Sequence, residues 1–215
     1  MPLVTLSSLT SGVYDRLEQN TAFYPSSEVV GNINDAIRTI NLYTGFLRTT
    51  ALLGSEPGQP IYDAPRSILC VTRVDYNGRE LDFASLASLC HSRPRWISDT
   101  TATTDSPVST WTPMGIKRIL LSPAPADSQV EIKLYGVAEP VPLVNHSDTI
   151  NMQAEFADMI KDLAACQCMV KCGGVVARDG MILYKQFLTR MKSLKRFRRN
   201  VNPAFRVEID KGVGV

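Results

Sequence analysis

Hydrophobic positions follow a helical period in the N-terminal part of the chain. Apolar residues repeat every four positions from Leu9 to Leu17, and Ser7 or Ser8 before them can cap a short helix. A longer helix is predicted over residues 26–47, where apolar residues form one stripe at helical spacing: Val30, Ile33, Ile37, Ile40 and Leu47. The chain therefore begins with two helices that each have one face to bury.

The same period returns in the C-terminal third. Apolar residues of 152–170 occupy one arc of a predicted helix, while Asp158 and Asp162 lie away from the centre of that arc. The Gly173–Gly174 pair should stop or kink this helix. A further helix is predicted over residues 179–199, with one apolar side and a strongly basic side next to it.

Between these helical parts, over residues 61–137, the pattern is that of extended chain. Residues 68–74 are rich in β-branched side chains, and the Asn77-Gly78 pair that follows favours a tight type I′ hairpin. Apolar and polar side chains alternate over residues 129–137, which is typical of a strand with one buried face. The middle of the chain is therefore predicted to form antiparallel sheet.

Two stretches around this sheet are predicted as irregular. Residues 53–60 contain two Gly and two Pro and indicate a connecting loop. Residues 92–113 are rich in Thr, Ser and Pro and indicate an exposed loop or hairpin, flanked by a short helix over 84–90 and a strand over 116–121. This second stretch contains the two Trp residues, which can act as anchors: Trp96 and Trp111.

Together these patterns predict an α+β fold, in which the N- and C-terminal helices form a helical bundle and a β-rich antiparallel insertion separates them. We expect the N-terminal helices in residues 1–58 and the insertion in 59–142. The C-terminal helices follow in 143–199, and an extended tail in 200–215.

Composition excludes several classes of protein. With 44% apolar and 20% charged residues, the chain is too apolar and too weakly charged to stay disordered. No apolar run approaches the roughly 18 residues that a bilayer span requires, and the first residues lack the basic stretch of a secretion signal. We therefore expect a soluble intracellular protein without a membrane segment.

Cysteine and histidine offer two candidate chemical sites, and neither fits well. Cys166 and Cys168 diverge by about 160° around a helix, so they cannot converge with Cys172 on one zinc ion. Cys90 and His91 are adjacent, like a nucleophile and its base, but neighbouring side chains seldom meet in a strand or a helix. We expect no metal site.

The sequence also lacks the motifs of common enzymes. It contains no Gly-rich phosphate loop followed by Lys and Ser or Thr, no Gly-x-Ser-x-Gly elbow and no His-Glu-x-x-His pair. We therefore expect neither an enzyme nor a bound cofactor.

The last predicted helix carries the charge pattern that points to a partner. Residues 185–199 hold seven basic residues and no acidic one: Lys185, Arg190, Lys192, Lys195, Arg196, Arg198 and Arg199. Residues 181–215 have a formal charge of +7 and residues 1–180 a charge of −5, so the net charge of +2 hides an acidic body and a basic arm.

Two interpretations of this basic segment stay open. Its cations can contact nucleic acid phosphates or an acidic protein surface. Alternatively, they form a solvated helix face that the helix dipole favours near a C-terminus. No helix-turn-helix spacing and no stacking aromatic motif accompanies them, so sequence-specific reading of DNA is not expected.

The order of these elements resembles a known family. Two N-terminal helices include Val30-Gly-Asn-Ile-Asn-Asp-Ala-Ile-Arg38, and the β-rich insertion contains Val71-Thr-Arg-Val-Asp-Tyr-Asn-Gly78. A Pro-rich exit, Tyr135-Gly-Val-Ala-Glu-Pro-Val-Pro142, leads to a long helix and a basic tail. In this layout the chain is similar to the head-to-tail connector, or portal adaptor, proteins of tailed bacteriophages.

The resemblance implies a structural role in the virion. Such proteins form a ring, commonly of twelve copies, that docks beneath the portal and presents a platform to tail or nozzle proteins. Genomic double-stranded DNA passes through the lumen without sequence specificity. The resemblance thus implies self-assembly, a place in the neck of the virion after assembly in the host cytoplasm, and a C-terminal extension along the portal.

The resemblance also suggests roles for particular residues. The seven basic residues of 185–199 are expected at the portal-facing end or toward the DNA channel, and Phe197 and Phe205 are expected to anchor the tail on a neighbouring subunit. A rival interpretation is a nucleic-acid-binding module that uses the basic helix, which would show DNA affinity that falls steeply with salt.

Overall fold

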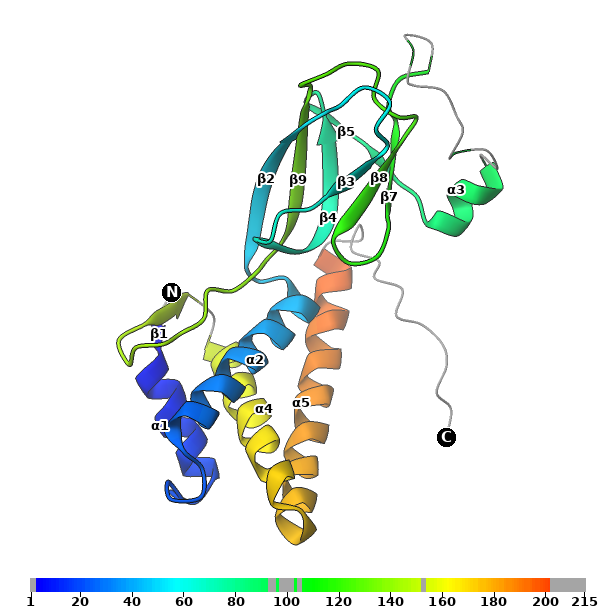
Figure 1. Cartoon of the computed structure of the whole chain (residues 1–215). Helices are drawn as coiled ribbons and strands as arrows, with labels where there is room; N and C mark the ends of the chain where they lie inside the picture. Colours follow the sequence, from blue (N-terminus) through cyan, green and yellow to red (C-terminus); the bar gives the residue numbers. More distant parts are fainter. Residues whose placement is uncertain (1–2, 93–95, 97–102, 104–105, 152–153, 202–215) are drawn as a thin grey trace. The chain divides into compact units, whose positions relative to one another are not determined.

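The computed structural model divides into two compact units (Figure 1). The second unit is inserted in the sequence of the first. The structure describes residues 3–92, 96, 103, 106–151 and 154–201. One unit combines Met1–Thr44 with Pro140–Val215, and Gly45–Glu139 form the other. The first unit is helical and the second is built mainly from strands, so the predicted α+β fold, with a β-rich insertion between helices, is confirmed.

Four helices form the helical unit within the described residues: α1 (Leu6–Arg16), α2 (Ser26–Thr44), α4 (Ala154–Cys172) and α5 (Gly174–Val201). The helix α4 lies in the middle, because α1, α2 and α5 all pack against it. A two-stranded antiparallel ribbon of β1 (Leu3–Thr5) and β10 (Thr149–Asn151) joins the two ends of the unit. The sequence pattern does not predict this ribbon, because each of its strands has only three residues.

The first helix begins before its predicted residues, and the second begins at Ser26 as predicted but ends three residues early. The helix α1 is capped by Thr5, whose hydroxyl accepts a hydrogen bond from the Ser8 amide at 3.1 Å, and not by Ser7 or Ser8. The helix α2 ends at Thr44 instead of residue 47, because Gly45 adopts a φ of 55° that stops the helix.

The turn between α4 and α5 is where the sequence predicts it. Gly173 and Gly174 have φ angles of 68° and 58°, which few other residues adopt. The helix α5 begins directly there, five residues before its predicted start. The sequence pattern misses the first turn because that turn has no buried apolar stripe: Val175 and Val176 are exposed. Gly180 does not interrupt the helix but allows close packing on α4, since a Cβ atom there would lie 2.9 Å from the Met169 Cβ atom.

The β unit consists of two four-stranded sheets (Figure 1). One has the order β2-β9-β4-β5, with β2 (Arg48–Gly54), β9 (Glu131–Ala138), β4 (Ile68–Tyr76) and β5 (Arg79–Glu80). The other has the order β3-β8-β7-β6, with β3 (Ile61–Asp63), β8 (Arg118–Ser122), β7 (Thr110–Pro113) and β6 (Asp82–Phe83). Among the described strands only β6 and β7 pair in parallel.

Side chains from both sheets form one hydrophobic core. Ile132 and Leu134 of β9 are fully buried, and they share a cluster with Val74 of β4 and with Trp111 and Leu121 of the other sheet. The predicted alternation in residues 129–137 is therefore confirmed, and so is the hairpin, because Asn77 and Gly78 both have positive φ angles between β4 and β5. The short helix α3 (Leu86–Ser92) lies close to its predicted place.

Two of the predicted loops contain strands. Leu53 and Gly54 end the strand β2, which pairs with β9 along its whole length, so the chain passes into the β unit after Thr44 and not after residue 58. Residues 110–113 form β7 because Trp111 and Thr112 are buried in the core, whereas Trp96 is half-buried. Leaving the unit, the chain crosses after Glu139, three residues before the predicted boundary.

Gly136, in the middle of the central strand β9, provides a test of this packing. A Cβ atom there would lie 2.5 Å from the Ile68 Cγ2 atom and 2.6 Å from the Cys70 carbonyl oxygen, which is backbone and cannot move easily. We expect Gly136→Ala to lower the free energy of unfolding by about 1–3 kcal/mol. Denaturant unfolding followed by tryptophan fluorescence measures this, because Trp111 is buried in the same core.

Gly31→Ala serves as the matched control. A Cβ atom at Gly31, in the helix α2, meets no atom within 4 Å, so this change should be neutral or stabilise by up to about 1 kcal/mol. Equal stability of the two variants would contradict the packing described for β9.

Candidate functional site

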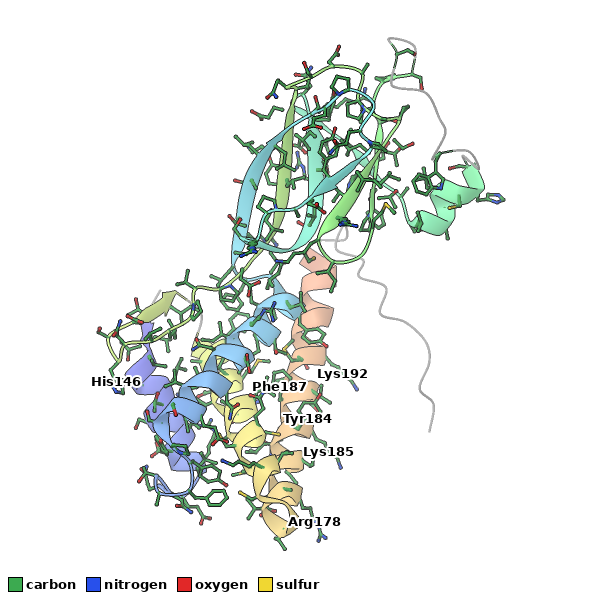
Figure 2. All side chains as sticks on the ribbon, in the orientation of Figure 1. His146, Arg178, Tyr184, Lys185, Phe187 and Lys192 are labelled. Carbon is green, nitrogen blue, oxygen red and sulfur yellow. The ribbon has the colours of Figure 1, made fainter. Side chains whose placement is uncertain are left out.

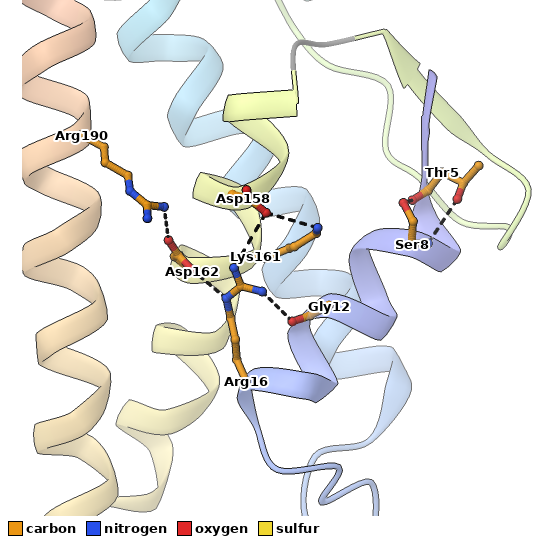
Figure 3. A network of polar contacts seen from close by, with 8 residues as sticks. All are labelled: Thr5, Ser8, Gly12, Arg16, Asp158, Lys161, Asp162 and Arg190. Carbon is orange, nitrogen blue, oxygen red and sulfur yellow. Dashed lines mark hydrogen bonds and ion pairs between the residues drawn. The ribbon is translucent and has the colours of Figure 1, made fainter. Parts of the chain in front are cut away.

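A buried carboxylate connects three helices of the helical unit (Figure 3). Asp162 of α4 is only 4% exposed. Its Oδ1 atom accepts a hydrogen bond from Arg16 Nε of α1 at 2.7 Å, and its Oδ2 atom accepts one from Arg190 Nη1 of α5 at 2.6 Å. A carboxylate in such a place needs both charged partners, because burial without them would cost several kcal/mol.

Arg16 is held in turn by neighbouring groups. Its Nη1 atom donates to the Gly12 carbonyl at 2.8 Å, and its Nη2 atom lies 3.9 Å from Asp158 Oδ1. Asp158 also pairs with Lys161 at 3.3 Å. The network thus fixes α1 and α5 on opposite edges of α4, as the positions of Arg16 and Arg190 in Figure 3 show.

This network changes the interpretation of the basic segment, because Arg190 is paired with Asp162 inside the subunit. About half of the Arg190 side chain remains exposed. The sequence pattern does not reveal this, since Asp162 lies off the main apolar arc of its helix. It is buried because α4 is surrounded by α1, α2 and α5, and the clue in the sequence is the nearly continuous apolar run from Leu163 to Val170.

Three other basic residues of α5 point away from the helical core. Arg178, Lys185 and Lys192 are spaced seven residues apart, which places them within about 20° per step on one side of the helix. All three are exposed, and among the described residues none of them forms an ion pair. Figure 2 labels them along the outer side of α5. We call these three residues the basic line.

The sequence identifies Lys185 and Lys192 as contact candidates but misses Arg178. Arg178 precedes the predicted start of the helix, and only the longer helix α5 brings it into line with the other two. The signal that could have found it is the seven-residue spacing, which Arg199 continues in the sequence.

Exposed apolar side chains accompany the basic line. Met181 and Leu188 are 47% and 38% exposed and lie about 40° and 60° around the helix from Lys185, by projection. Ile182, which is 52% exposed, lies on the other side of the line. The outer face of α5 therefore combines cations with apolar surface, and residues 180–201 contain no acidic residue.

The other predicted contact residues cannot be placed in this face. Four basic residues and one aromatic residue lie in the backbone of α5, but their side chains are outside the described part: Lys195, Arg196, Phe197, Arg198 and Arg199. Phe205 and the rest of the predicted tail beyond Val201 lie outside the described residues altogether.

The cysteines of α4 face different neighbours, as their spacing predicts. The Cys168 thiol accepts a hydrogen bond from Asn32 Nδ2 of α2 at 3.1 Å, whereas a hydrogen bond of 2.6 Å joins Cys172 to the Tyr24 hydroxyl. Burial raises the pKa of both the Cys166 and the Cys168 thiol, which favours the neutral form. Within the part of the chain that is described, no three His, Cys, Asp or Glu residues are grouped so that they could hold a metal ion.

A membrane-spanning helix is not found either. None of the helices in the described part is both long enough and apolar enough to cross a bilayer.

A comparison with known protein families identifies the family of this chain. The family model of the SU10 adaptor protein matches residues 4–207, nearly the whole chain, and the chain therefore belongs to the SU10 adaptor protein family. The predicted relationship to phage head-to-tail adaptors is thereby confirmed. A search of curated proteins gives no match.

Asp162 offers a direct test of the network that neutralises Arg190. Asp162→Asn keeps the shape of the side chain but leaves Arg16 and Arg190 without their anion, so we expect the free energy of unfolding to fall by about 1–3 kcal/mol. Helical circular dichroism during denaturant unfolding measures the loss. Asp158→Asn is the control, since 60% of the Asp158 side chain is exposed, and it should change stability by less than about 1 kcal/mol. Similar losses in both variants would contradict a special role for Asp162.

Proposed function

We propose that this chain is the subunit of a head-to-tail adaptor ring, commonly of twelve copies, in the neck of a tailed phage virion. In this role it assembles in the host cytoplasm, docks on the portal and offers a platform to tail or nozzle proteins. Genomic DNA leaves the capsid through the lumen of the ring. Membership of a phage adaptor family supports this role, which is structural and not catalytic.

The observation that carries the proposal at residue level is the basic line on α5. Consecutive cations of the line are separated by about 10.5 Å along the helix axis, so three of them cover roughly 21 Å without an internal partner in the described residues. These exposed cations are available to an anionic partner, which a row of one sign attracts. The fixed helix, held on α4 through Arg190 and Asp162, presents this row in one orientation.

An acidic protein surface is a better partner for this face than DNA. Phosphate contacts require cations and hydrogen-bond donors but gain little from apolar side chains. Met181, Ile182 and Leu188 expose apolar surface on both sides of the basic line, and protein interfaces bury such residues at their centre. A ring that transmits DNA should also not bind it tightly. We therefore assign the face to an acidic surface of the portal.

The asymmetric charge of the chain also supports self-assembly. Residues 1–180 carry −5 and residues 181–215 carry +7, so copies of the chain have complementary charges that can meet in neighbouring subunits. The same segment thus serves two kinds of contact in the proposed ring: the basic line toward the portal, and the residues beyond α5 toward a neighbouring copy.

Reversal of two charges tests the assignment to the portal. Lys185→Glu combined with Lys192→Glu should slow association with purified portal at least tenfold at low salt, because like charges then face each other. The control is Arg66→Glu combined with Arg79→Glu, which changes the net charge equally at exposed positions of the β unit. The association rates of both double variants with immobilised portal are measured at low and at high salt.

The same variants distinguish the rival function. For the rival function, the unmodified chain should bind a random DNA duplex with an affinity that falls steeply with salt. Loss of this DNA affinity in the Lys185→Glu/Lys192→Glu variant, with portal binding unchanged, would show that the chain is a nucleic-acid-binding module and that the portal assignment is wrong.

A further inference from the structure

The strand β2 forms an open edge of its sheet. It lies at the end of the order β2-β9-β4-β5, and among the described strands it pairs with β9 alone, from Arg48 opposite Val137 to Gly54 opposite Glu131. The Ala138 amide donates to the Leu47 carbonyl, and the Ser55 amide donates to the Val130 carbonyl. In an antiparallel ladder, hydrogen-bonded and free positions alternate, so the odd-numbered residues of β2 bond to β9.

The even-numbered residues therefore turn their backbone groups to the open side. Arg48, Thr50, Leu52 and Gly54 present their N–H and C=O groups there, and all four residues are exposed. Within the described residues, no backbone hydrogen bond from outside the strand reaches these groups. Unpaired edges of this kind bind further strands.

The edge of β2 lacks the features that usually block pairing. Its seven residues contain no proline and no lysine, and its register with β9 has no bulge. Leu52 is 61% exposed in the middle of the strand. By contrast, the other strands at sheet ends have two or three residues: β5, β3 and β6. A long edge without a bulge, with an exposed leucine at its centre, favours a partner strand that covers it.

The C-terminal part of the chain contains a segment with the matching pattern. Residues 205–210, Phe-Arg-Val-Glu-Ile-Asp, alternate strictly between apolar and charged side chains, as a strand with two different faces requires. They follow the end of α5 and lie outside the described residues. A six-residue segment is close in length to the seven-residue edge of β2.

We propose that residues 205–210 of one copy of the chain add as a fifth strand to the open edge of β2 in another copy. The proposal rests on the proposed function, because it requires copies that assemble side by side. In this proposal the segment that contains the predicted anchor Phe205 binds to the β2 edge. Main-chain hydrogen bonds supply affinity, and alternate side chains supply specificity.

The two faces of the added strand match the two faces of the sheet. Ala51 and Leu53 of β2 pack against the core of the β unit, so Phe205, Val207 and Ile209 extend that apolar face. Arg206, Glu208 and Asp210 then lie on the outer face, where Arg48 and Lys133 of the sheet supply cations for the two acids; Lys133 lies opposite Leu52 in the register. An antiparallel register with Glu208 opposite Leu52 and Asp210 opposite Thr50 satisfies both faces.

Hydrogen exchange of the full chain tests the pairing. In an antiparallel addition the outer-face tail residues turn their N–H groups to β2, so Glu208→Pro removes a donor from the centre of the pairing, and the amides of Thr50 and Leu52 should exchange at least tenfold faster than in the unmodified chain. The amides of Thr49, Ala51 and Leu53 bond to β9 and should not change. Val213→Pro, in the same tail but outside the alternating segment, is the control and should leave all these amides unaffected.

Crosslinking supplies an independent readout of strand geometry. In a chain with Cys90→Ser, Leu52→Cys is combined in turn with a single cysteine at each position from 205 to 210. Disulfides between two copies should form at every second tail position, because alternate residues of a strand share one face. Crosslinks without this period, crosslinks only within one copy, or equal exchange of Thr50 and Leu52 in all three chains would overturn the proposal.

The mass of the same samples separates this inference from the proposed function. Closed rings whose β2 amides exchange equally in the unmodified chain and in Glu208→Pro would refute the strand addition and leave the adaptor function standing. The opposite result is also informative. If the tail slows exchange of the β2 amides, but the copies form only dimers or open assemblies that never close into a ring or dock on the portal, the strand addition is supported and the proposed ring is refuted.

Discussion

Asp162 carries a carboxylate into the helical unit, and the arrangement of the surrounding helices depends on neutralising it. Arg16 reaches it from α1 and Arg190 reaches it from α5, at 2.7 and 2.6 Å. With α4 between them, these three side chains hold the first and last helices of the unit in one arrangement although they are far apart in the sequence. The directed contact of Arg190 with Asp162 adds to the close packing of Gly180 on Met169, and together they fix the rotation of α5 on α4.

The fixed rotation of α5 decides which charges remain for a partner. Arg190 is used internally, and the basic line of Arg178, Lys185 and Lys192 faces outward beside exposed Met181 and Leu188. The same order of elements leaves the insertion with a core of its own and with a long open edge at β2. The two units thus present surfaces of different kinds, one charged and one of unpaired backbone, which suits a protein that the proposed function places between several partners.

Local signals in the sequence predicted the parts of this fold that depend on neighbouring residues. The Asn77-Gly78 hairpin, the Gly173 turn and the alternation around Ile132 all follow from backbone preferences or from spacing within one element. The division into helices at the ends and strands between them follows from the change of period. These features suffice to define the α+β class, and the layout suffices to suggest the family.

Features that depend on distant residues could not be predicted in this way. Burial of Asp162 requires that α4 is covered on several sides, which no single helix pattern reveals. Leu53 and Gly54 of β2 begin a stretch whose Gly and Pro content indicates a loop, and only the register with β9 makes them extended. The basic candidates were therefore found as a charge run, but their separation into the internal Arg190 and the outward Lys185 and Lys192 required the structure.

Electron microscopy of the purified protein, alone and mixed with purified portal, tests most directly whether the chain is a ring subunit. The proposed function predicts closed rings that stack coaxially on the portal, either preformed or assembled on it, with an open lumen wide enough for duplex DNA. A monodisperse monomer that never forms a ring and never docks on the portal at any protein concentration would contradict it.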